Sequence, residues 1–141
     1  MELEVCYQLL LATFLGALIG LEREIKKREA GLQTYSLVSL GSCIFTLVTI
    51  YFTQSFGGLE IDLARVIQAI AVGMGFIGAG TIFKGATGVE GLTTAAGLWV
   101  MAAIGVAVGA KFYDLSIFST LLAILILAGF GKLEEKFFRE K

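Results

Sequence analysis

Five long apolar runs, joined by short charged segments, constrain this chain more than any other feature of its sequence. They cover residues 3–21, 35–56, 63–83, 92–110 and 115–131. A helix of about 17 to 22 residues, rising about 1.5 Å per residue, crosses the roughly 30 Å hydrocarbon core of a bilayer. The runs leave little chain for a separate soluble unit. The sequence therefore predicts one all-α domain over residues 1–141, a polytopic membrane bundle of five transmembrane helices.

The composition agrees with a membrane protein and argues against other classes. Charged residues make up 16% of the chain, against about 25% in soluble domains. The chain has no histidine and no proline, and its two cysteines, Cys6 and Cys43, lie in apolar runs where we expect them to be buried as small hydrophobes. A net charge of -1 argues against nucleic-acid binding. We expect no enzyme activity, no catalytic residues and no cofactor.

Basic residues gather in alternate joining segments, and this sets the expected orientation. They are Arg23, Lys26, Lys27 and Arg28 after the first run, Lys84 after the third, and Lys132, Lys136, Arg139 and Lys141 in the tail. Basic segments of membrane proteins face the cytoplasm. We therefore expect the N-terminus outside and the C-terminus in the cytoplasm. Residues 132–141 should form an amphipathic cytoplasmic tail along the membrane surface.

The third run contains Gly73, Gly75, Gly78 and Gly80. The pattern matches the dinucleotide-binding motif G-x-G-x-x-G, but the preceding strand and the soluble βαβ unit are missing, so we treat the match as coincidental. On a helix these glycines form two small faces on opposite sides, and small residues let helices approach closely in lipid. We expect the third run to be the central helix. The alternative is a break at Gly78 that offers carbonyl groups to a cation.

Other small residues predict close helix contacts as well. Gly16 with Gly20 in the first run, and Gly105 with Gly109 in the fourth, form G-x-x-x-G pairs. Trp99 lies near the middle of the fourth run rather than at a headgroup boundary. We expect its ring to pack into the bundle, with the wall of a cavity as the alternative.

Arg65 and Gln68 lie inside the third run, one helical turn apart. Polar groups within a membrane span are costly and are functional candidates by default. Two interpretations of Arg65 remain open. It has the i,i+3 spacing of an ion pair with Asp62 and would then anchor the helix at the interface. Alternatively, Arg65 and Gln68 line a polar cavity.

A candidate cytoplasmic polar cluster gathers where the first run ends and the fourth begins. Its members are Glu22, Arg23, Thr34, Gly91, Thr93 and Thr94. A helix start capped by a hydroxyl presents free N–H groups and a partial positive charge. We expect Glu22 to dock against the start of the fourth helix. The alternative is ordinary helix capping and anchoring at the interface.

Two stretches, residues 16–42 and 73–109, resemble the MgtC/SapB family of bacterial membrane proteins. The resemblance rests on the Glu-Arg pair at 22–23, the Ala-Gly-Leu-x-Thr segment at 30–34, the glycine-rich stretch, and Gly-Leu-x-Thr-Ala-Ala-x-Leu-Trp at 91–99. Residues that match the family pattern are Glu22, Arg23, Gly31, Thr34, Arg65, Gln68, Gly75, Gly78, Gly80, Gly91, Thr94 and Trp99. The chain departs from it at Gln33, Thr93 and Val100, and shows no counterpart of the soluble C-terminal domain of many members.

The resemblance implies a five-span domain in the cytoplasmic or inner membrane of a bacterium or an archaeon. It also implies a link to magnesium limitation and ion homeostasis, and a domain that modulates other membrane proteins including ATP synthase. The scarcity of carboxylates within the runs favours such a regulator. The alternative is a transporter or channel for Mg²⁺ or another cation, built from several copies, although no metal-ligand cluster stands out. We expect the lipid membrane, a second or further copy of the chain, and another membrane protein complex as partners.

Overall fold

The computed structural model describes residues 3–55, 62–85 and 88–130. Within these residues five α-helices follow one another, namely α1 (Leu3–Ile25), α2 (Leu32–Ser55), α3 (Leu63–Ala79), α4 (Leu92–Gly109) and α5 (Tyr113–Ile124). A π-helix, η1 (Leu125–Phe130), continues α5. Between α3 and α4 the strands β1 (Phe83–Lys84) and β2 (Val89–Glu90) form an antiparallel hairpin. The predicted tail over 132–141 lies outside the described residues.

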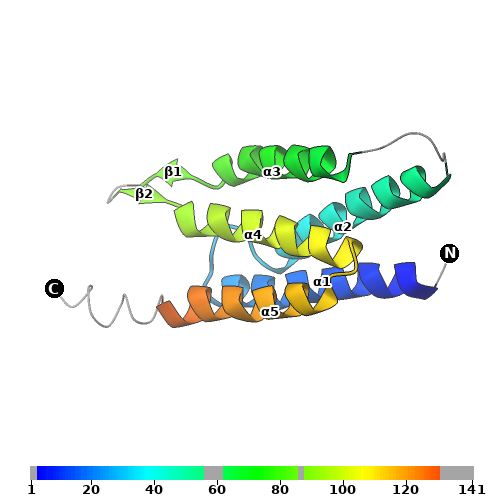
Figure 1. Cartoon of the computed structure of the whole chain (residues 1–141). Coiled ribbons are helices and arrows are strands. Elements are labelled where there is room, and N and C mark those ends of the chain that lie inside the picture. The colour runs from blue at the N-terminus through cyan, green and yellow to red at the C-terminus, as the bar shows by residue number, and fades with distance from the viewer. Residues whose placement is uncertain (1–2, 56–61, 86–87, 131–141) are drawn as a thin grey trace.

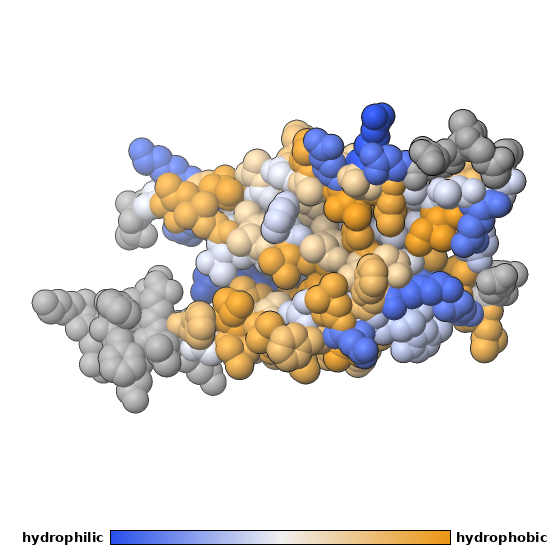
Figure 2. Space-filling view, viewed as in Figure 1, coloured by the Kyte–Doolittle hydropathy of each residue, from blue (hydrophilic) through white to orange (hydrophobic). Residues whose placement is uncertain are grey.

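The helices run side by side, up and down along a common direction (Figure 1). Four segments are long and apolar enough to cross a membrane, namely α1, α2, α4, and α5 together with η1, and α3 is a shorter apolar helix of 17 residues. Hydrophobic side chains cover much of the face shown in Figure 2. The prediction of an all-α membrane bundle is confirmed. The helix in the third run is shorter than predicted, because residues 80–84 form a turn and a strand.

The centre of the bundle is α4. It packs against α1, α2, α3 and α5. Its buried residues are Thr94, Gly97, Leu98, Met101, Ala102, Ile104, Gly105, Val106, Ala107, Val108 and Gly109. An added Cβ at Gly105 would overlap the carbonyl oxygen of Ser39 in α2, and one at Gly109 would lie 2.8 Å from Cβ of Thr46. On α1, a Cβ at Gly16 would lie 2.7 Å from the carbonyl oxygen of Tyr35. The close contacts predicted from the two G-x-x-x-G pairs are therefore confirmed.

The prediction that the third run is the central helix is wrong, because α3 lies at the edge of the bundle (Figure 1). It buries only Met74 and Gly78, and Gly78 packs against Ala95 of α4. An added Cβ at Gly73 or Gly75 would meet no atom within 4 Å. Glycine permits a close approach between helices but does not supply the neighbour. The two-sided glycine pattern therefore fits an edge helix as well as a central one.

Trp99 also differs from its expected position, since 53% of its surface is exposed. The fully buried side of α4 is formed by Leu98, Met101 and Ala102, which are at most 2% exposed. Positions 98, 101 and 102 share one helical face, and residue 99 points about 100° away from residue 98. The indole therefore lies outside the core of the bundle.

The backbone of α3 is continuous through Gly78 and ends at Ala79, with Gly80 as the C-terminal cap in right-handed helical geometry. The carbonyl oxygen of Gly78 accepts two hydrogen bonds from Thr81, one from its backbone N–H at 3.0 Å and one from its hydroxyl at 2.8 Å. A carbonyl oxygen has two lone pairs, and both are used here. The helix does not open at Gly78 to offer this carbonyl to a cation.

Candidate functional site

A cluster of polar side chains lies at the end of the bundle where α1 ends and α2 and α4 begin, which we call the basic end. Its members are Glu22, Arg23, Lys26, Glu29, Tyr35 and Thr94. They come from α1, the segment after it, α2 and α4. We refer to these six residues as the polar cluster.

Half of the polar cluster is an ion-paired group on α1 and the residue just after it. Nε of Arg23 lies 2.6 Å from Oε2 of Glu22, and Nζ of Lys26 lies 2.8 Å from its Oε1. The side chain of Arg23 is only 3% exposed and that of Glu22 12%. Burying a charge is costly unless it is paired, and each oxygen of this carboxylate has a cation of its own chain beside it.

Lys26 also ties this group to η1, the last helix among the described residues. Its Nζ donates a hydrogen bond of 2.8 Å to the carbonyl oxygen of Leu127 in η1. The sequence offers no signal for this bond, because the two residues are 101 positions apart. One ammonium group therefore holds α1 and η1 together at the basic end.

The other half of the polar cluster joins the segment after α1 to α2 and α4. The hydroxyl of Thr94 donates to Oε2 of Glu29 at 3.0 Å, and the hydroxyl of Tyr35 donates to the carbonyl oxygen of Thr94 at 3.2 Å. Tyr35 is fully buried, and an added Cβ at Gly97 would overlap its hydroxyl oxygen. Hydrogen bonds from its own backbone N–H and from Thr94 hold the pKa of the Glu29 carboxylate below its usual value.

The turn after α1 brings Glu29 to this position. Lys27 has a left-handed backbone with φ of 51°, and the N–H of Arg28 donates to the carbonyl of Arg23 at 3.0 Å, which is the Schellman pattern of a helix end. Oε2 of Glu24 then accepts the N–H of Leu32 at 3.1 Å and caps the start of α2. The backbone thus reverses within six residues and carries Glu29 toward α4.

The expected docking of Glu22 against the start of α4 is not what the structure shows, because Glu29 bonds to Thr94 there instead. The expected hydroxyl cap is also absent from this helix start. Its N-terminal cap is Gly91, with φ of 85° and no side-chain hydrogen bond. A Cβ at Gly91 would overlap the carbonyl oxygen of Thr81, so this position requires glycine on two grounds. Of the remaining predicted members, Thr93 is exposed and Thr34 is partly buried.

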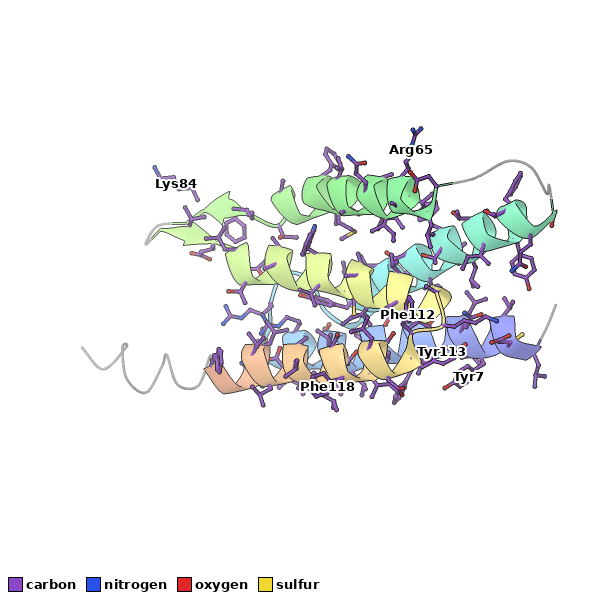
Figure 3. The ribbon with its side chains drawn as sticks, viewed as in Figure 1. Tyr7, Arg65, Lys84, Phe112, Tyr113 and Phe118 are labelled. Carbon is purple, nitrogen blue, oxygen red and sulfur yellow. The ribbon has the colours of Figure 1, made fainter. Side chains whose placement is uncertain are left out.

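Arg65 and Gln68 do not join the polar cluster. Both side chains are exposed on α3, and Arg65 points away from the other helices (Figure 3). Nε of Arg65 lies 3.6 Å from Oδ2 of Asp62, whose Oδ1 accepts the N–H of Ala64 at 2.9 Å and caps the helix. These contacts favour the anchoring interpretation of Arg65. Because both side chains are exposed, the described part of a single copy does not enclose them.

Sequence comparison places these features in a known family. The profile of the MgtC family matches residues 9–136, which is most of the chain. The chain belongs to the MgtC family. The resemblance seen in the Glu-Arg pair, the glycine-rich stretch and the start of α4 is therefore confirmed.

This MgtC-family chain is similar in sequence to several named proteins. It is 39% identical to Protein SrpB of Synechococcus elongatus, over 94% of this chain and 78% of SrpB. It is 37% identical to the putative magnesium transporter YhiD of Escherichia coli, over 94% and 63% of the two chains. It is 41% identical to Protein MgtC of Brucella abortus, over 83% and 47%. The chain thus spans only part of the longer relatives. No solved structure matches it.

One buried polar residue of this MgtC-family chain was missed by sequence reasoning. Gln8 of α1 is 1% exposed, and its Nε2 donates to the carbonyl oxygens of Val108 and Gly109, both at 3.0 Å. It therefore satisfies the last carbonyl groups of α4 at the end of the bundle opposite the polar cluster. A lone amide inside an apolar run is a signal for such a bond, but its partners are 100 residues away.

Buried hydroxyl groups form a row along α2 without opening a passage for ions. Ser39, Ser42 and Thr46 are all buried, and the hydroxyl of Thr46 donates to the carbonyl of Ser42 at 2.9 Å. Gly105 and Gly109 of α4 contact this row directly, as described above. The row is therefore part of a packed contact between helices. Among the described residues, no group of three or more His, Cys, Asp or Glu side chains could hold a metal ion.

Proposed function

We propose that this chain is an inner-membrane protein of magnesium homeostasis that acts as a regulator by binding other membrane proteins. The family supports the link to magnesium, since one relative is named a putative magnesium transporter and another is named MgtC. The basic residues at one end of the bundle support a cytoplasmic position for the polar cluster.

The observation that carries the regulatory proposal is that the carboxylates of the polar cluster are already ion-paired or hydrogen-bonded within the chain. Glu22 is paired with Arg23 and Lys26, and Glu29 accepts the hydroxyl of Thr94. Magnesium binds oxygen ligands and usually keeps several waters, so a pathway would need free carboxylates or carbonyls around a wet cavity. The ion pairs and hydrogen bonds of the polar cluster instead join α1, α2, α4 and η1 to one another. A rigid helical scaffold of this kind suits binding to another membrane complex.

The alternative is transport of Mg²⁺ or another cation by an assembly of several copies. Its support is the printed name of YhiD, with which this chain shares 37% identity. In that case the pathway would lie between copies, since the contact between α2 and α4 is closely packed within one copy.

Two measurements separate the proposals. Purified protein in sealed vesicles with an entrapped magnesium-sensitive dye should show no more Mg²⁺ entry than empty vesicles. Inverted membrane vesicles that contain the protein should show slower ATP-driven proton pumping than vesicles without it, because the family resemblance suggests ATP synthase as a partner. Magnesium entry that is lost in Glu22→Gln or Gln68→Leu would overturn the regulatory proposal. If the rate of ATP-driven proton pumping is unchanged at every density of this protein, then ATP synthase is not its target.

A further inference from the structure

One exposed side of α3 carries a glutamine together with small residues. Gln68, Val72, Gly75 and Ala79 are spaced 4, 3 and 4 residues apart, and all four are exposed. At about 100° per residue they lie within about 60° of one another around the helix. The buried residues Met74 and Gly78 lie about 110° away on average. We call these four exposed residues the outer face of α3.

Gln68 is the residue on the outer face that most needs a partner. It lies six positions after Asp62, about 9 Å along the helix axis from the charged start of α3. Among the described residues nothing hydrogen-bonds to its amide, although its side chain is exposed on an apolar helix that we expect to lie in the membrane. Leaving an amide in hydrocarbon without a hydrogen bond is costly, and glutamine side chains in membranes bond across helices. The amide therefore indicates a helix from another molecule.

The rest of the outer face lets such a helix come close. Gly75 and Ala79 form a small-xxx-small pair, and a Cβ added at Gly75 would meet no atom within 4 Å. The backbone of a second helix can therefore reach contact distance beside Gly75. Val72, which is 71% exposed, projects beside it and would fill the space at the edge of the contact.

A second copy of this chain fits the outer face better than an unrelated helix. All copies enter the membrane in the same orientation, so residues at the same depth meet across a two-fold axis along the membrane normal. A glutamine amide contains both a donor and an acceptor and can pair with another glutamine amide. The start of α3 brings one arginine and one aspartate from each copy, Arg65 and Asp62, so no net charge gathers beside the contact.

We propose that two copies of this chain associate in parallel through α3, with the Gln68 amides hydrogen-bonded to each other and the backbones in contact at Gly75. The proposal does not depend on whether the protein regulates other complexes or transports ions. It assigns a role to Gly75 and Ala79, a small-xxx-small pair that the bundle of a single copy leaves exposed.

The first test compares two glycine substitutions on the same helix. Gly73 and Gly75 both lack any atom within 4 Å of an added Cβ, so Gly73→Leu and Gly75→Leu should leave the fold of a single copy intact. Energy transfer between donor- and acceptor-labelled copies in dilute vesicles measures association. We expect the wild type and Gly73→Leu to associate equally, Gly75→Leu to be monomeric, and Gln68→Leu to bind about tenfold more weakly. Monomeric wild type, or equal association of the two glycine variants, would overturn the proposal.

The second test locates the contact without disturbing it. In a Cys6→Ala, Cys43→Ala background, Val72→Cys should form a disulfide-linked dimer on mild oxidation. Ile77→Cys is the control, because Ile77 is 45% exposed on another side of the same helix. Equal cross-linking at both positions, with a dimer yield that falls as lipid is added, would indicate random collisions. That result would refute a contact through the outer face.

Discussion

Gln8 offers the sharpest test of how the helices are held together. The change Gln8→Leu keeps the size of the side chain but removes the amide that donates to the carbonyls of Val108 and Gly109. The carbonyl of Val108 keeps the N–H of Lys111 at 3.0 Å, so mainly the carbonyl of Gly109 loses its donor. A buried acceptor without a partner costs about 1–3 kcal/mol, and the second lost bond adds about 0.5–1.5 kcal/mol. We therefore expect Gln8→Leu to lower the free energy of unfolding by about 1.5–4.5 kcal/mol.

The assay for this prediction is reversible unfolding in mixed detergent micelles, followed by circular dichroism. Gln33→Leu is the matched control, because it makes the same chemical change at an exposed position of α2. Exposed substitutions usually change the free energy of unfolding by less than about 0.5 kcal/mol. If Gln8→Leu costs no more than Gln33→Leu, then the amide does not secure the end of α4 and the reasoning is refuted.

Two further predictions concern the core and the polar cluster. Gly105→Ala should cost about 1–3 kcal/mol, because the new Cβ would overlap the carbonyl of Ser39 and force α2 away from α4. Gly41→Ala has open space around it and should instead stabilise the protein by up to about 1 kcal/mol, so a loss at both positions in the same unfolding assay would contradict the packing. The lowered pKa of Glu29 stabilises the folded chain above the usual pKa of a glutamate and ceases to do so as the pH falls through the lowered value. Wild type should therefore lose more stability than Glu29→Gln between about pH 5 and pH 3, and parallel curves would show that the carboxylate is not involved.

The features that follow from local pattern are predicted well from the sequence. The five helices lie close to the apolar runs, because hydrocarbon requires backbone that is hydrogen-bonded within each helix. The exception is the end of the third run, where the chain leaves α3 and enters the hairpin. The close contacts at Gly16 and Gly105 follow from small residues at helical spacing. The family is likewise visible in a few short motifs, and the match over residues 9–136 confirms it.

The features that depend on contacts between distant parts of the chain are not predicted by local sequence pattern. The same glycine pattern fits a central or an edge helix, and only the packing of α4 against its four neighbours puts α3 at the edge. Likewise, Glu22 and Glu29 are both plausible partners for Thr94, and the left-handed backbone at Lys27 decides in favour of Glu29. Hydropathy depends on the residues of one segment, whereas these contacts join residues up to about a hundred positions apart and depend on the free energy of the whole bundle. The sequence therefore predicts which segments cross the membrane, and the tertiary structure decides which polar groups meet.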